Sequence, residues 1–187
     1  PVAVGMGARV TVIDRNVDRL RQLDLVFGNR IQTLYSSVQN LEDAVLDAEV
    51  VIGGVLIPGA SAPKLVTRAM VESMKKGAVV VDVAIDQGGC FETSYATTHA
   101  EPTFVVDGVV HYCVANMPGA VALTSTFALN NATIGHAVAI ANKGWKQALR
   151  DDIHLCQGLN VALGQVSYEA VAKTLSYEYV PALTLLS

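Results

Sequence analysis

The residue of greatest chemical interest is an aspartate that ends an apolar stretch of the chain. Residues 78–85 are mostly Val, Ala and Ile, and Asp86 follows them, with Gly88 and Gly89 close behind. Such a run is typical of a strand covered on both faces in a parallel sheet. Ligands of open parallel sheets bind beyond the carboxyl ends of the strands, where glycines let the backbone approach them. The pattern predicts Asp86 as a site residue, with a cap for the following segment as the alternative role.

A second acidic residue ends an earlier predicted strand. Residues 9–14 predict a strand that stops at Asp14, and Asn16 can cap the helix after it. In dinucleotide-binding domains an acid at this place accepts hydrogen bonds from the adenosine ribose, and its charge disfavours the extra phosphate of NADP. A charge near a helix N-terminus is the alternative role. The Gly-x-Gly-x-x-Gly phosphate loop expected before such an acid does not occur in the sequence.

Two more turns follow predicted strands. Residues 30–35 and 49–52 predict strands, and Ser36 and the pair Gly53-Gly54 come directly after them. Because the carboxyl ends of parallel strands share an edge, we predict that these turns lie along the same edge as Asp86. Taken singly, Ser36 could be a helix cap and the glycines a tight turn.

The elements that must position these residues alternate between strand and helix. Helical patterns follow Asn16 and cover residues 38–48 and 65–74, between the strands already named. Residues 103–106 and 109–115 then predict a hairpin around Asp107-Gly108. This alternation predicts an α/β fold, a doubly wound Rossmann-like parallel sheet with right-handed crossovers that lacks its first strand.

The pattern of predicted elements changes near residue 122, from alternating strands and helices to mainly helices. Residues 124–142 predict a long Ala-rich helix, 145–149 another helix, 159–166 a small hairpin and 168–175 a last helix. We predict two domains, residues 1–122 and 123–187. The second is small for an independent core and is expected to pack against a partner domain.

Composition excludes several classes of protein. The 187 residues carry a net charge of −4 with no cluster of Lys and Arg, which argues against a nucleic-acid partner. No apolar run is long enough to cross a membrane. The three cysteines form no CxxC pair and no two of the four histidines have metal-ligand spacing, so no metal site is predicted and a reducing, cytoplasmic setting is expected. The 51% hydrophobic and 16% charged content favours an oligomer.

Several motifs together resemble the NAD-dependent alanine dehydrogenases, and the resemblance spans essentially the whole chain. They are VAIDQGGCFET at 83–93, VLIPGA at 55–60, HYCVANMP at 111–118, STFAL at 125–129 and KGW at 143–145. The NAD-binding part of proton-translocating transhydrogenases is related but resembles these stretches less. The resemblance implies that this chain is the C-terminal half of such an enzyme: the NAD domain after its first strand and phosphate loop, then the return segment of the catalytic domain.

The resemblance also implies roles for individual residues. Asp86 would be a catalytic-site residue and Asn116 would lie near the substrate. The cofactor NAD would be bound by residues at the adenosine end and at the nicotinamide end of the site: Asp14, Arg19, Ser36, Val55, Leu56, Val83, Ala84, Ile85, Asp86, Val114, Ala115, Asn116 and Met117. The family's catalytic histidine and its substrate-binding lysine and arginine would lie outside this chain.

The implied reaction is reversible oxidative deamination of L-alanine to pyruvate and ammonia with NAD, in a hexamer. The chain as given would then need its N-terminal half or a companion chain, with no nucleic acid and no membrane as partner. Two alternatives stay open. The chain could be a non-catalytic nucleotide-binding fragment, or a transhydrogenase-like NAD-binding domain, which would have no alanine activity.

Overall fold

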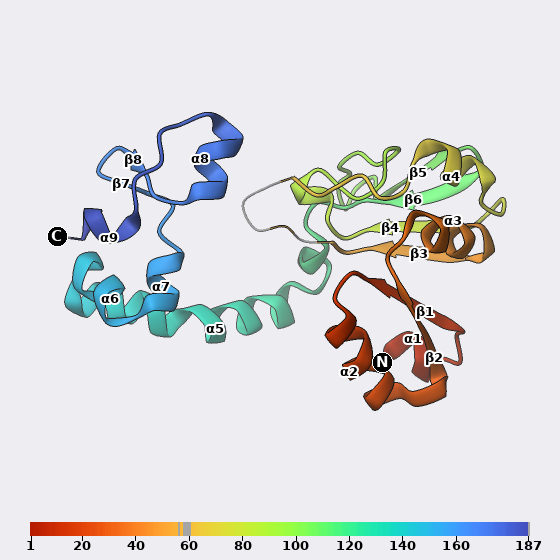
Figure 1. Cartoon of the computed structure of the whole chain (residues 1–187), viewed down its shortest axis with the longest axis horizontal. Coiled ribbons are helices and arrows are strands. Elements are labelled where there is room, and N and C mark those ends of the chain that lie inside the picture. The colour runs from red at the N-terminus through yellow and green to blue at the C-terminus, as the bar shows by residue number, and fades with distance from the viewer. Residues whose placement is uncertain (56, 58–60, 187) are drawn as a thin grey trace. The chain divides into compact units, whose positions relative to one another are not determined.

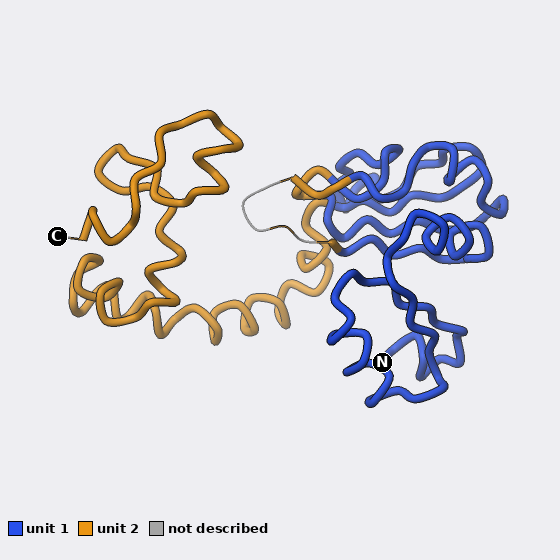
Figure 2. Tube along the Cα trace, viewed as in Figure 1, with its two compact units in different colours: residues 1–54, 64–85, 89–114 blue, residues 55–63, 86–88, 115–187 orange. Residues whose placement is uncertain are grey.

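The structure is a computed structural model that describes residues 1–55, 57 and 61–186, so Leu56 lies outside the described residues (Figure 1). The chain forms two compact units (Figure 2). Unit 1 comprises residues 1–54, 64–85 and 89–114, and unit 2 comprises residues 55–63, 86–88 and 115–187. The predicted division into domains 1–122 and 123–187 stays a prediction.

Unit 1 begins with a parallel pair of strands. The helix α1 (Val2–Gly5) precedes β1 (Val10–Asp14), α2 (Val17–Phe27), a short 3-10 helix (Gly28–Arg30) and β2 (Ile31–Tyr35). The strands are in parallel register, so that Asp14 lies opposite Tyr35. The Asn16 side chain caps α2 by accepting a hydrogen bond from Arg19 N, as the sequence predicts.

A four-stranded sheet forms the rest of unit 1. It contains β3 (Val50–Gly53), β4 (Val79–Asp82), β5 (Thr103–Val106) and β6 (Val109–Tyr112), in the order β3-β4-β6-β5. The strands β3, β4 and β6 are parallel, and β5 is an antiparallel edge. The predicted hairpin is confirmed: Asp107 and Gly108 both have positive φ, 51° and 78°, as a two-residue turn between antiparallel strands requires.

Helices complete the α/β pattern of unit 1. The helix α3 (Val38–Asp47) precedes β3 and α4 (Arg68–Ser73) precedes β4. Val71 of α4 and Val80 of β4 are fully buried, as is the Phe91 ring in the loop after β4. The predicted α/β class with a parallel-dominated sheet is confirmed. Among the described residues, however, β1 and β2 form one sheet and β3 to β6 another, so the predicted common edge is divided.

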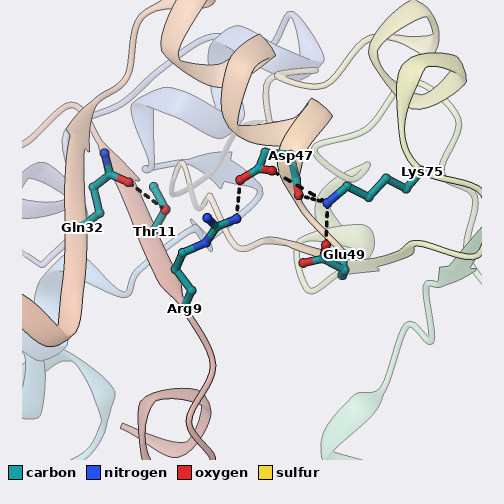
Figure 3. Close-up of polar contacts among 6 residues, drawn as sticks. All are labelled: Arg9, Thr11, Gln32, Asp47, Glu49 and Lys75. Carbon is teal, nitrogen blue, oxygen red and sulfur yellow. Dashed lines mark hydrogen bonds and ion pairs between the residues drawn. The ribbon is translucent and has the colours of Figure 1, made fainter.

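Ion pairs join the amino ends of strands from both sheets of unit 1 (Figure 3). Arg9, just before β1, pairs with Asp47 at the end of α3. Lys75, which precedes β4, lies 2.5 Å from Glu49 Oε1 and 3.7 Å from Asp47 Oδ1. Glu49 directly precedes β3, so these four side chains connect the starts of three strands. Thr11 and Gln32 make a long 3.5 Å contact between β1 and β2.

Three predicted elements are shorter in the structure. The strand predicted at 78–85 is β4 and ends at Asp82, because the Asp82 side chain bonds to the loop at Cys90 and Phe91. The helix predicted at 65–74 starts at Arg68, because Leu65 N and Val66 N donate to Cys90 O and Thr67 caps the helix. The strand predicted at 109–115 ends at Tyr112, its last partner to β4 being Val81.

Unit 2 is mostly helical. A 3-10 helix (Met117–Val121) precedes α5 (Ala122–Lys143), α6 (Trp145–Asp151) and α7 (Ile153–Gln157). The hairpin β7 (Val161–Ala162) and β8 (Gln165–Val166) precedes α8 (Glu169–Leu175) and α9 (Ala182–Leu185), so the predicted hairpin and helices are confirmed. Leu149, Cys156 and Leu186 form a small core. None of the helices described in either unit is long and apolar enough to cross a bilayer.

The helix α5 buries none of its own residues. Leu123, Phe127 and Leu129 are each more than half exposed, and Ile134 and Val138 are nearly so. No Asp, Glu, Lys or Arg occurs between residues 122 and 142. A long helix without charged residues that exposes several large apolar side chains is normally covered by another part of an assembly.

Candidate functional site

The polar residues at the ends of β1 and β2 are neighbours. Asp14 Oδ1 accepts a 2.8 Å hydrogen bond from Asn16 N, and Ser36 N donates a 3.0 Å bond to Asp14 O. Within the described part of the chain the second carboxylate oxygen of Asp14 accepts no hydrogen bond. The cap of α3 is Ser37, whose hydroxyl accepts from Asn40 N, so the half-buried Ser36 is not needed for capping.

Arg19 lies in the first turn of α2, close in sequence to Asp14. Its side chain is exposed, and its guanidinium donates a 3.2 Å hydrogen bond to Gln22 Oε1 on the same helix. An exposed Arg in this position can turn toward a ligand at the end of β1 at little cost. Its predicted place beside an adenosine stays a prediction.

The two glycines after β3 have different surroundings. A Cβ on Gly53 would lie 2.6 Å from Cε2 of the Phe91 ring, whereas none of the described atoms lies within 4 Å of a Cβ on Gly54. Gly53 is therefore required by the packing of Phe91. Gly54 leaves open space at the strand end, where main-chain atoms are accessible to a ligand.

Loop 83–90 carries Asp86 and is tied to the end of β4. Val83 N donates a 2.8 Å bond to Gly53 O, and Gly89 N donates a 2.9 Å bond to Ala84 O. Ala84 and Ile85 are buried as whole residues, while Val83 is half exposed and is the most accessible of the three to a cofactor. Asp86 itself is exposed, within the 3-10 helix Ile85–Gln87.

The other predicted site residues fall in both units. Val114, in unit 1, is buried and forms an isolated bridge with Thr97. Unit 2 contains Val55 and Asp86 as well as Ala115, Asn116 and Met117, where the chain leaves the strand β6 and enters a 3-10 helix. Ala115 and Asn116 are exposed, and Val55 and Met117 are half-buried. Their predicted roles stay predictions, and that of Leu56 lies outside the described residues.

Asp82, the last residue of β4, is a buried polar residue that sequence reasoning did not name as a site residue. It is fully buried, and its carboxylate accepts hydrogen bonds from Cys90 N at 3.2 and 2.9 Å and from Phe91 N at 3.4 Å. The signal was present in the sequence, because Asp82 is the one charged residue within the apolar run 78–85. Charged residues are almost never fully buried unless they are paired with other groups.

The buried titratable groups of unit 1 are not arranged as a catalytic base or nucleophile. His111 lies in β6; its Nδ1–H donates to Val109 O at 3.0 Å, and its Nε2 is 2.7 Å from Thr93 Oγ1, from which it accepts. Burial lowers the pKa of His111, so the imidazole stays neutral, and burial raises the pKa of the Cys113 thiol. Among the described residues, no three His, Cys, Asp or Glu side chains are placed to hold a metal ion.

The fold and the polar strand ends define an α/β protein of the parallel-sheet class. Residues 1–169 match the family described as "Alanine dehydrogenase/PNT, C-terminal domain", and the chain belongs to this family. It is 59% identical to the alanine dehydrogenase of Halomonas elongata over 99% of this chain, and 60% identical to that of Bacillus subtilis over 97%. A solved L-alanine dehydrogenase structure covers the whole chain at a TM-score of 0.81 and 47% identity.

A second solved structure is more distant. A transhydrogenase from Sinorhizobium meliloti covers 64% of this chain at a TM-score of 0.55 and 30% identity. The chain spans about half the length of the alanine dehydrogenases it matches, 50% of the Halomonas protein and 48% of the Bacillus one.

Proposed function

We propose that this chain forms the NAD-binding part and the return segment of an enzyme that oxidatively deaminates L-alanine to pyruvate and ammonia. The observation that carries the proposal is the combination of 59–60% identity to alanine dehydrogenases and a TM-score of 0.81 to an L-alanine dehydrogenase over the full chain. The transhydrogenase alternative has weaker support, because that likeness covers less of the chain at a lower TM-score.

The strand ends of unit 1 have the chemistry that NAD requires at its adenosine end. The carboxylate of Asp14 has an oxygen available for ribose hydroxyls, since only Oδ1 is used by Asn16 N among the described groups. Its negative charge would repel the additional phosphate of NADP. Ser36 on the neighbouring strand end and Arg19 in α2 would contact the adenosine, and Val55 would line the path of the cofactor.

At the nicotinamide end of the cofactor, two short segments of the chain and two polar side chains would take part. The segments 83–86 and 114–117 would flank the nicotinamide, which accepts the hydride when NAD is bound. Ala84, Ile85 and Val114 are almost fully covered in this chain, so the exposed Val83 and Ala115 would make the larger part of these contacts. Asp86 and Asn116 are exposed and would face the substrate.

The reaction consumes L-alanine, NAD⁺ and water and releases pyruvate, ammonium, NADH and a proton. The ammonium of L-alanine would first lose the proton that appears among the products. Cα would then lose a hydride, for which bound NAD would supply the acceptor, and the nitrogen lone pair would form a C=N bond to Cα. Water then adds to this carbon and the C–N bond breaks. Asp86 would orient the amine, ammonia or water as a negative partner, so its share of catalysis is positional and electrostatic. His111 is committed to Thr93 and Val109, and we assign it no proton transfer.

The setting of the enzyme is also part of the proposal. A cytoplasmic location is supported by the three cysteines, which are buried and form no disulfide among the described residues. An oligomer that includes sequence outside this chain is supported by α5, whose apolar residues are exposed in the chain by itself. That the oligomer is a hexamer is suggested by the resemblance to alanine dehydrogenases alone.

The test is an assay of NADH formation with L-alanine, using the protein that contains this chain together with its flanking sequence. The proposal predicts turnover with L-alanine and NAD, and Asp86→Asn should lower kcat at least about 100-fold with little effect on NADH binding. Glu72→Gln on α4 removes an exposed carboxylate elsewhere and should leave kcat unchanged. NADH binding without any alanine-dependent turnover would contradict the proposal and favour a transhydrogenase-like or non-catalytic role.

A further inference from the structure

Asp82 carries a buried carboxylate at the end of an otherwise aliphatic strand. Among the described residues, no Lys, Arg or His lies at ion-pair distance from it. A carboxylate without a cation is costly to bury unless hydrogen bonds replace its water. The hydrogen bonds of Asp82 therefore have to offset the cost of burying its carboxylate.

The hydrogen bonds of Asp82 go to the far end of the loop that β4 leads into. Cys90 N donates to both carboxylate oxygens, at 3.2 and 2.9 Å, and Phe91 N donates a longer 3.4 Å bond to Oδ2. Bonds from main-chain N–H groups to a carboxylate are charge-assisted and stronger than neutral ones. Asp82 thereby fixes the point at which the loop returns to unit 1.

Gly89 fits this arrangement from the side of the loop. A Cβ at this position would lie 2.5 Å from Asp82 Oδ2 and 3.0 Å from Ile85 Cδ1, and the residue has φ of +76°. Its N–H donates to Ala84 O at 2.9 Å and closes the loop on itself. The glycine therefore lets the backbone pass directly against the carboxylate.

Asp86 lies between two residues whose main chains are hydrogen-bonded to each other, Ala84 before it and Gly89 after it. We propose that Asp82 is a positioning residue that holds this loop in the conformation in which Asp86 reaches the substrate. The inference rests on the proposed function, in which Asp86 takes part in alanine oxidation. A group misplaced by about 1 Å can lower a rate by about 100-fold, so the hold on the loop matters for turnover.

The test uses Asp82→Asn in the protein with its flanking sequence. Asparagine keeps the size of the side chain and can place its one oxygen at the position of Oδ2, but it carries no charge, and its NH₂ group then faces Cys90 N in place of the acceptor Oδ1. We expect kcat to fall about 10- to 100-fold while the KM for NAD is nearly unchanged. Hydrogen exchange at the Cys90 and Phe91 amides should become faster, because Cys90 N loses one of its two acceptors and both amides lose a charged partner.

A double-variant comparison separates positioning from a general loss of stability. If Asp82 acts through Asp86, the variant that combines Asp82→Asn with Asp86→Asn should be no slower than Asp86→Asn alone. Thr93→Val is the matched control, since it breaks the buried bond to His111 without touching the loop. It should lower the melting temperature yet leave kcat at the wild-type value.

The possible outcomes separate this inference from the proposed function. If Asp82→Asn does not fold, Gly89→Ala tests the same contact from the loop and should give the same loss in kcat. Wild-type turnover in folded Asp82→Asn, or rate losses that multiply in the double variant, would overturn the inference. If the wild type lacks alanine activity, the proposed function fails. In that case, unchanged exchange of the Cys90 and Phe91 amides in Asp82→Asn would also show that Asp82 does not fix the loop conformation.

Discussion

The position of Asp14 gives the proposed cofactor preference a specific cause. One carboxylate oxygen is used by Asn16 N, which keeps the side chain at the end of β1. The other oxygen can accept hydrogen bonds from vicinal ribose hydroxyls, and a phosphate in place of one hydroxyl would meet a like charge.

Asp14→Ser should therefore weaken NADH binding and reduce the discrimination against NADPH. Hydrogen bonds to a charged group contribute about 1.5–3 kcal/mol, so the Kd for NADH should rise about 10- to 100-fold. Fluorescence titration with both reduced cofactors measures the change. Asp18→Ser, an exposed acid of α2 paired with Arg21, is the control and should bind NADH normally. Equal NADH affinity in Asp14→Ser would contradict the assignment.

The buried His111 should make unfolding depend on pH. Burial lowers its pKa below the ordinary value of 6.5, so below that value the unfolded chain takes up a proton that the folded chain does not. Stability from this residue is present above about pH 6.5 and decreases as the pH falls toward the lowered folded pKa.

Urea unfolding between pH 8 and pH 5 tests this expectation. His111→Gln cannot take up the proton, so its free energy of unfolding should fall less steeply with acidification than that of the wild type, even though it starts lower. Identical slopes for His111→Gln and wild type would show that His111 titrates equally in both states.

At the scale of elements, the ion pairs at the amino ends of β1, β3 and β4 connect the two sheets of unit 1 (Figure 3). Lys75 lowers the pKa of Glu49 through a hydrogen bond and its charge, and Glu49 raises the pKa of Lys75. The stabilisation from Glu49 is present above its ordinary pKa of 4.5 and is lost as the pH falls through the lowered value. That from Lys75 is lost only as the pH rises through a value above 10.5.

Glu49→Gln should consequently destabilise the protein slightly at neutral pH and low salt. The difference from wild type should disappear at about 1 M salt, because these side chains are exposed and screened, and also in acid below the pKa of Glu49. Denaturant midpoints at the two salt concentrations measure it. Glu42→Gln on α3 serves as the control. A difference that persists in high salt would mean that Glu49 acts by packing.

Much of the order of elements could be predicted from the sequence, because local signals agreed with the fold. Asn16 caps α2 and Asp107-Gly108 forms the hairpin turn as their residue types predict. The end of β4 could not be predicted, since residues 83–85 are as strand-like as those before them. Its position depends on bonds from Asp82 to residues eight and nine positions later. Such contacts are tertiary and carry no periodic signal.

The candidate site was predictable to a similar degree. The pattern predicted Asp14 and Ser36 at strand ends, and the two are neighbours across β1 and β2. It also predicted Asp86 directly after a strand, but β4 ends at Asp82 and Asp86 lies in a 3-10 helix. Whether a side chain is accessible was not predictable, as Ala84, Ile85 and Val114 are buried although their neighbours are exposed. The sequence alone left Ser36 as a possible helix cap, whereas in the structure Ser37 caps α3.

At the scale of the whole molecule, α5 bears on assembly. Its exposed apolar residues and its lack of charge from 122 to 142 predict that it is covered in the proposed oligomer. Phe127→Asp places a charge on this helix and should shift the sedimentation profile toward smaller species. Leu25→Asp in α2, where the leucine is 87% exposed, should leave the profile unchanged. An unaltered assembly in Phe127→Asp would argue against α5 as an interface.

Transfer of deuterium from substrate to cofactor tests the central claim most directly. The protein that contains this chain would be incubated with L-alanine deuterated at Cα and with NAD, and the reduced cofactor and the keto acid analysed by mass spectrometry. The proposed reaction predicts a reduced cofactor that carries one deuterium and pyruvate that carries none from Cα. Reduced cofactor without deuterium, or no reduction at all with L-alanine, would contradict it.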